Sequence, residues 1–204
     1  MIKTKKAIIN FSLVCGLISA IMFSMVGFST SCEEMYKNII RIRIIANSDT
    51  PEDQSLKLEI RDAVLEKSKE LYSGTKCYDD ALYVTEQNLD ALLEAAQKTV
   101  YDKGFDYSVT AEVREEFFET REYDSFTLPA GSYKTAVFTV GEAEGKNWWC
   151  VIYPEVCVGA CSARLNDAVS DKTAYVAYKS DKYVVKFKTV EIFEKVKKYF
   201  DFAK

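Results

Sequence analysis

The spacing of hydrophobic residues changes along this chain, and that change constrains the fold more than any other feature. In segment 38–46, isoleucines alternate with Arg41 and Arg43, which is the period of a strand with one apolar face. Segments 51–72 and 79–100 instead repeat their apolar residues every three or four positions, as amphipathic helices do. The pattern therefore predicts one strand followed by two helices.

After the two predicted helices, apolar and polar residues alternate again. Segments 107–120 and 133–141 alternate apolar with polar residues, and a fourth strand is predicted over 148–152. A short strand over 183–187 is predicted to precede a C-terminal amphipathic helix over 190–202. The stripe of that helix expected to pack on the domain consists of Val190, Phe193, Val196 and Phe200.

Together these segments predict an α+β fold. We expect about four mostly antiparallel strands, with two helices between the first and second strands. A C-terminal helix and an N-terminal signal or transmembrane helix complete the prediction.

The N-terminal end has the composition of an export signal. Lysines precede an apolar run from Ala7 to Phe28, which as a helix could span about 30 Å of hydrocarbon. Basic residues stay in the cytoplasm, so the chain after the run is sent outside. Small residues at 29–31 suit cleavage, so residues 1–31 are either a signal peptide or a membrane anchor. We predict that residues 32–204 form a single extracytoplasmic domain.

The composition excludes several kinds of function. The chain has no histidine, so a Ser-His-Asp or Cys-His catalytic site cannot form. The net charge is -4 with both signs interspersed, which provides no basic face for nucleic acid. The sequence also has no glycine-rich phosphate loop and no close run of metal ligands. We therefore expect no cofactor, no metal and no nucleic-acid partner.

Two cysteines flank a proline. If the chain turns at Tyr153-Pro154, Cys150 and Cys157 face each other across a hairpin within disulfide reach. So tight a turn requires a cis Tyr153-Pro154 bond or a wider loop. Cys161 could compete with Cys157, and buried free thiols are the rival interpretation. Cys150 and Cys157 are the disulfide candidates.

Three further groups of residues could carry function. Trp148 and Trp149 are adjacent on a predicted strand and point to opposite faces, each as a core residue or a binding anchor. Segment 47–49 serves turn and capping chemistry or binds an anion beside a helix start. The third group is a cluster of carboxylates, which forms either a solvated face with arginine partners or a paired-carboxylate catalytic site. It consists of Glu112, Glu115, Glu116, Glu119, Glu122 and Asp124.

Three motifs resemble one known family. The first spans Arg41–Val64 and reads RIRIIANSDTPEDQSLKLEIRDAV. The second spans Leu128–Tyr133 and reads LPAGSY, and the third spans Gly145–Cys157 and reads GKNWWCVIYPEVC. In this order they resemble stage II sporulation protein R of endospore-forming bacteria. The segment after Cys157 carries no motif of that family.

The resemblance implies a secreted signalling protein and not an enzyme. Members of that family are made in the forespore and act in the space between forespore and mother cell. There they activate a membrane-embedded aspartic protease, which removes the pro-sequence of the mother-cell sigma factor, sigma-E. The family has no catalytic residues to carry over. The matched motifs contain the partner-binding candidates Arg41, Arg43, Asn47, Asp49, Trp148 and Trp149.

Two other functions stay open on the sequence. An exported cell-wall hydrolase would use the acidic cluster near Glu115 and Asp124. A cell-surface binding module would bind wall or membrane without any effect on proteolysis.

Overall fold

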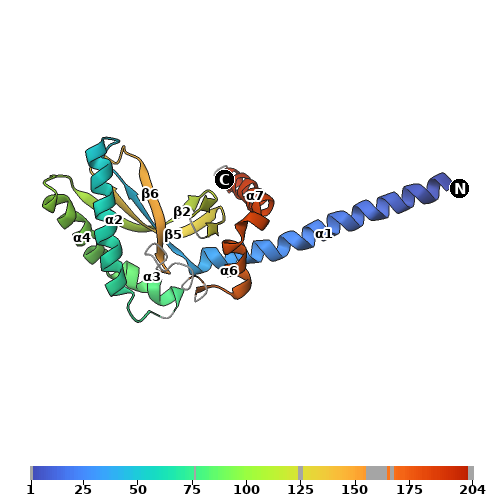
Figure 1. Cartoon of the computed structure of the whole chain (residues 1–204), viewed down its shortest axis with the longest axis horizontal. Coiled ribbons are helices and arrows are strands. Elements are labelled where there is room, and N and C mark those ends of the chain that lie inside the picture. Colours follow the sequence, from blue (N-terminus) through green and yellow to red (C-terminus); the bar gives the residue numbers. More distant parts are fainter. Residues whose placement is uncertain (1, 76, 124–125, 155–164, 166–167, 202–204) are drawn as a thin grey trace.

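The computed structural model describes residues 2–75, 77–123, 126–154, 165 and 168–201, and shows a sheet between two unlike layers (Figure 1). The elements in chain order are α1 (Ile2–Asn38), β1 (Ile40–Ile45), α2 (Pro51–Leu71), α3 (Tyr78–Gln87), α4 (Leu89–Asp102), β2 (Val109–Phe118), β3 (Arg121–Glu122), β4 (Thr127–Leu128), β5 (Gly131–Val140), β6 (Asn147–Tyr153), α6 (Asp171–Tyr178), η1 (Ser180–Lys182) and α7 (Val184–Asp201).

The main sheet has four strands in the order β2-β5-β1-β6. β2 runs antiparallel to β5 and β6 runs antiparallel to β1, whereas the central pair β1 and β5 is parallel. The strands β3 and β4 form a separate small hairpin. The predicted α+β fold with a mostly antiparallel sheet is confirmed.

Three helices, and not the two predicted, lie between β1 and β2. Thr50 caps α2 by accepting a hydrogen bond from the backbone N–H of Asp53, with Pro51 in the first turn. The second predicted helix is divided at Asn88, whose backbone is not helical (φ -115°, ψ 19°). The Asn88 side chain donates to the carbonyl of Val84 at 2.9 Å and so ends α3 before α4 begins.

The helices α2, α3 and α4 cover one face of the sheet (Figure 1). Ile40, Ile42 and Ile44 of β1 point to this face and are completely buried. They meet Ile60 of α2 and Leu92 of α4 in one apolar cluster. The alternation in the sequence therefore identified this core correctly.

The opposite face is covered by the end of α1, by α6 and α7, and by the β3–β4 hairpin. The predicted strand over 183–187 is wrong, because Tyr183 lies in a turn and α7 occupies the positions from 184 onward. Two β-branched valines favoured strand there, but Val184 and Val185 stand exposed on a helix. The predicted packing stripe of α7 is wrong in part. Val190 is buried, whereas Phe193 and Val196 are exposed, and the Phe200 side chain lies outside the described residues.

The N-terminal helix belongs to this second layer. α1 continues without a break through residue 38, and Phe28, Ser31 and Met35 of its last turns are buried. The Phe28 ring packs edge-on against Phe187 of α7, with the centroids 5.0 Å apart. Residues on both sides of the predicted boundary at 31 therefore pack together, and the boundary itself stays a prediction. Within the described part of the chain, no helix combines the length and apolar character needed to cross a membrane.

Candidate functional site

The two arginines of β1 point to the same face of the sheet but end in different surroundings. Arg41 is completely buried, with its guanidinium carbon 3.8 Å from the centroid of the Phe118 ring. Its Nη2 donates to the Tyr123 hydroxyl at 2.6 Å, while Nε and Nη1 reach no acceptor among the described residues. Burial lowers the pKa of this guanidinium. Arg41 is thus a core residue, and its side chain offers no surface to a partner.

Arg43 lies further along the strand, where the second layer no longer covers the sheet. Its Nη1 donates to Glu116 of β2 at 2.9 Å, and its Nε donates to Asn147 of β6 at 3.0 Å. Arg114 donates to both Glu116 and Glu112. A half-exposed network of charges therefore crosses the sheet from β2 to β6.

The two tryptophans of β6 point to opposite faces, as predicted. Trp149 pairs with Arg43 in the β1–β6 register, and the Arg121 guanidinium carbon lies 4.3 Å from its ring centroid. Trp148 packs instead against the apolar cluster under α2, with Arg61 at 5.5 Å. Both rings are only partly buried. Trp149 therefore stands beside the charged network, and Trp148 does not.

We call this uncovered region the open sheet face. It consists of Arg43, Glu112, Arg114, Glu116, Asn147 and Trp149. Tryptophan and arginine are enriched in protein interfaces, and this region holds a partly exposed Trp149 beside arginines. The open sheet face is the candidate functional site.

Asn47 and Asp49 are used within the fold. The Asn47 amide donates to Asp53 at 2.8 Å and accepts from the backbone N–H of Glu142 at 3.0 Å. Asp49 accepts from the backbone N–H of Lys146 at 2.7 Å. The turn between β5 and β6 lies so close that a Cβ on Gly145 would collide with the Ser48 carbonyl. These side chains clamp the turn, as the capping interpretation predicts.

The carboxyl of Asp53 completes this clamp. Burial by itself would raise its pKa, but hydrogen bonds from Ser48 and Asn47 outweigh burial and lower the pKa. The ionised carboxylate thus holds the 47–49 turn against the first turn of α2.

The acidic cluster is largely paired with basic residues. Glu112 and Glu116 both accept from Arg114, and Glu119 pairs with Lys195 of α7 at 2.6 Å. Glu122 lines a pocket, and Asp124 lies outside the described residues. This arrangement is the solvated face with arginine partners, and it provides no specific support for a hydrolase.

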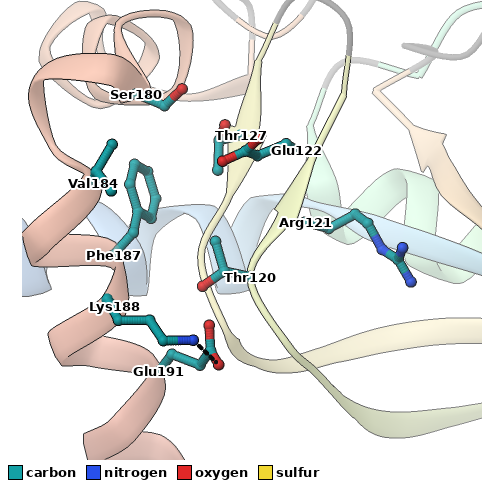
Figure 2. Close-up of a pocket in the computed structure, with 9 residues that line it drawn as sticks. All are labelled: Thr120, Arg121, Glu122, Thr127, Ser180, Val184, Phe187, Lys188 and Glu191. Carbon is teal, nitrogen blue, oxygen red and sulfur yellow. Dashed lines mark hydrogen bonds and ion pairs between the residues drawn. The ribbon is translucent and has the colours of Figure 1, made fainter.

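A pocket of about 470 Å³ lies between the β3–β4 hairpin and the helices η1 and α7 (Figure 2). Lys188 and Glu191 are joined at one end by a 2.9 Å hydrogen bond, and Phe187 forms an apolar wall. The Thr120 hydroxyl is buried and reaches no partner in the part of the chain that the structure describes. Arg121 points away from α7, toward the open sheet face. The hairpin therefore separates the pocket from the candidate site.

The predicted hairpin is only partly described. The Tyr153-Pro154 bond is cis, one of the two geometries that the turn requires. Cys150 is buried on β6, but Cys157 and Cys161 lie outside the described residues, so the Cys150–Cys157 disulfide stays a prediction. No cluster of potential metal ligands occurs among the residues described.

Sequence reasoning did not bring two members of the site together with Arg43 and Trp149. Asn147 binds Arg43 across strands, and Arg114 holds two carboxylates together. Arg114 does alternate with Glu112 and Glu116, which places all three on one strand face. That alternation was the available signal, but it could not show which strand would lie beside β2.

The comparisons with known proteins agree on one family. No solved structure matches the chain. Stage II sporulation protein R of Bacillus subtilis (strain 168) is 35% identical over 118 residues, which cover 58% of this chain and 53% of that protein. The matched region thus spans about half the length of the relative. A family model for stage II sporulation protein R matches residues 36–163, a range that includes β1 to β6 and the whole open sheet face. This chain belongs to the stage II sporulation protein R family.

Proposed function

We propose that this protein acts in sporulation as an extracytoplasmic signal that activates a membrane-embedded aspartic protease by binding it. The activated protease would remove the pro-sequence of the mother-cell sigma factor, pro-sigma-E. The observation that carries this proposal is the 35% identity over 118 residues with stage II sporulation protein R. The protein would act in the space between forespore and mother cell, secreted or held by its N-terminal segment.

The open sheet face is the proposed contact with the protease. Trp149 is half-buried there, so a partner could cover the rest of its ring, while Arg43 and Glu116 present charges beside it. Partly exposed tryptophans surrounded by polar groups are frequent centres of binding energy. Arg41, Asn47 and Asp49 are not part of this proposed contact, since their side chains form hydrogen bonds within the fold.

Activation requires a difference in affinity. Binding shifts the protease toward its active arrangement only if the signal binds that form more tightly than the inactive one. We propose that the favoured arrangement is a dimer in which each protease chain supplies one aspartate. Equal affinities for the two forms would contradict this mechanism.

A reconstituted processing assay tests the function. The full chain is added to membranes that hold the protease and the sigma-factor precursor, and cleavage is followed on a gel. We expect cleavage to depend on the added protein. No cleavage, with folded protein and a competent protease, would refute the proposal.

The chain offers a matched pair of variants for the contact. Trp149→Ala removes the ring from the open sheet face, whereas Trp148→Ala removes the neighbouring ring from the opposite face. If Trp149 is a central contact, its loss should weaken activation about 30-fold, corresponding to about 2 kcal/mol of binding energy. Trp148→Ala should weaken activation no more than its effect on folding explains. Equal effects of the two variants would exclude the open sheet face as the contact.

A further inference from the structure

The helix α7 has an apolar face that nothing in the described structure covers. Its inner side is buried through Phe187, Val190 and Glu191. On the opposite side, Ile192 is 57% exposed and Phe193 is 63% exposed. This outer stripe consists of Val185, Ile192, Phe193 and Val196, at spacings that place all four on one side of a helix.

The charge around this stripe is unlike that of the rest of the chain. Residues 179–201 contain seven lysines and four acidic residues, in a protein whose net charge is -4. The helical period places Lys186 on one flank of the stripe and Lys188 and Lys195 on the other. Lys188 and Lys195 both pair with Glu191, and Lys195 also pairs with Glu119, and both lysine side chains remain exposed. An apolar face flanked by lysines is the composition of helices that lie in the surface of anionic membranes.

The apolar face of α7 adjoins a second exposed apolar surface. Phe23 and Val26 of α1 are 79% and 64% exposed, immediately before Phe28 enters the core. Lys186 of α7 donates to the Ser24 hydroxyl of α1 at 2.6 Å, which fixes the two helices together at this point. Figure 1 shows α7 beside the part of α1 that enters the domain.

We propose that α7 is a membrane-docking helix that lies in the surface of an anionic lipid bilayer, beside the point where α1 leaves the domain. The outer stripe enters the boundary between headgroups and acyl chains, and the flanking lysines meet lipid phosphates. α7 lies beyond the region matched by the family model, and the inference does not depend on protease activation. It would hold the domain at a defined orientation, with the open sheet face on the same side of the sheet as α7.

Hydrogen exchange on the full chain tests this directly, because it reports on α7 separately from α1. Protein is bound to vesicles of phosphatidylglycerol and phosphatidylcholine, and flotation confirms binding. We expect amides of α7 to exchange about tenfold more slowly than in protein without vesicles, since lipid excludes water from the stripe. Amides of α4 should be unchanged. Vesicles of phosphatidylcholine alone should reduce the effect because they carry no net negative charge, and high salt should reduce it because it screens the lysines.

Variants locate the effect on the stripe. Ile192→Asp together with Val196→Asp should abolish the protection, while Tyr101→Asp, at an equally exposed site on α4, should retain it. Unchanged α7 exchange in vesicle-bound wild-type protein would overturn the proposal. Protection that appears without vesicles at raised protein concentration would also overturn it, by showing that a second copy covers the stripe.

Discussion

The two faces of the sheet are built in different ways. The face under α2, α3 and α4 is aliphatic, and β1 contributes Ile40, Ile42 and Ile44 to it without any exposed area. The other face holds a buried arginine among aromatic rings, Arg41 with Phe118 and Tyr133. It is closed by segments from both ends of the chain, α1 and α7.

The two faces differ in how much of their surface is left for binding a partner. The aliphatic face uses residues between β1 and β6, so its core forms within the region that defines the family. The second face is covered over only part of its area, which leaves Arg43 and Trp149 at the surface. One side of the sheet is therefore core along its length, whereas the other combines a core with the candidate site.

The largest predicted effect is on the aliphatic face. Ile42→Ala removes a fully buried side chain and should lower the free energy of unfolding by about 3 kcal/mol. Ile45→Ala, on the same strand but half-exposed on the other face, is the matched control and should cost about 1 kcal/mol. Urea unfolding measures both. Equal losses of unfolding free energy in the two variants would show that both faces of β1 contribute equally to stability.

The second prediction concerns the buried arginine. Tyr123→Phe removes the acceptor that Arg41 binds among the described residues, and should destabilise the fold by about 1–3 kcal/mol. Arg41→Met has similar volume and no charge to desolvate, so stability should be unchanged or increased. The same unfolding measurement applies. If Arg41→Met instead lowers the free energy of unfolding strongly, the contact with the Phe118 ring stabilises the fold by more than desolvation of the guanidinium costs.

The third prediction concerns acid. Burial would raise the pKa of Glu34, but hydrogen bonds from Thr173 and Ser170 lower it, so the carboxylate ties α1 to the start of α6. A carboxyl with a lowered folded pKa stabilises the fold above its unfolded pKa, about 4.3 for Glu. Stability should therefore be constant from neutral pH to about pH 5 and fall at lower pH.

Glu34→Gln isolates this contribution. The variant should lose part of the acid dependence, and the amides of α6 should exchange faster at neutral pH. Asp53 is the comparison on the other side of the fold, because its pKa is lowered in the same direction by Ser48 and Asn47. Identical pH profiles for Glu34→Gln and the wild type would contradict the assigned role.

The smallest effect is expected at the open sheet face itself. Arg114 is exposed and pairs with Glu112 and Glu116, so Arg114→Ala should change stability by less than about 1 kcal/mol. If the open sheet face is the contact, the same variant should also weaken protease activation, by more than the small loss of folded protein explains. Thermal unfolding measures the change in stability, and the processing assay measures the change in activation.

Much of the fold followed from local patterns. Alternation located β1, β2 and β5, the expected hairpin at Tyr153-Pro154 located β6, and the Thr50-Pro51 pair marked the start of α2. The errors lie where local signals were ambiguous: Asn88 interrupts a helical period, and Val184 and Val185 favour strand but lie on a helix. In these places tertiary packing or a side-chain hydrogen bond decided the backbone.

The sequence by itself determined which residues share a face, because side chains alternate along a strand and recur along a helix. It therefore placed Arg41 with Arg43 and separated Trp148 from Trp149. Only the tertiary structure decided that Arg41 is completely buried while Arg43 is partly exposed, since the second layer covers only part of the sheet. The same holds for α7, whose apolar residues are shared between a packed side and an open side. Periodicity gives the direction of a side chain, but what lies in that direction depends on contacts between segments far apart in the chain.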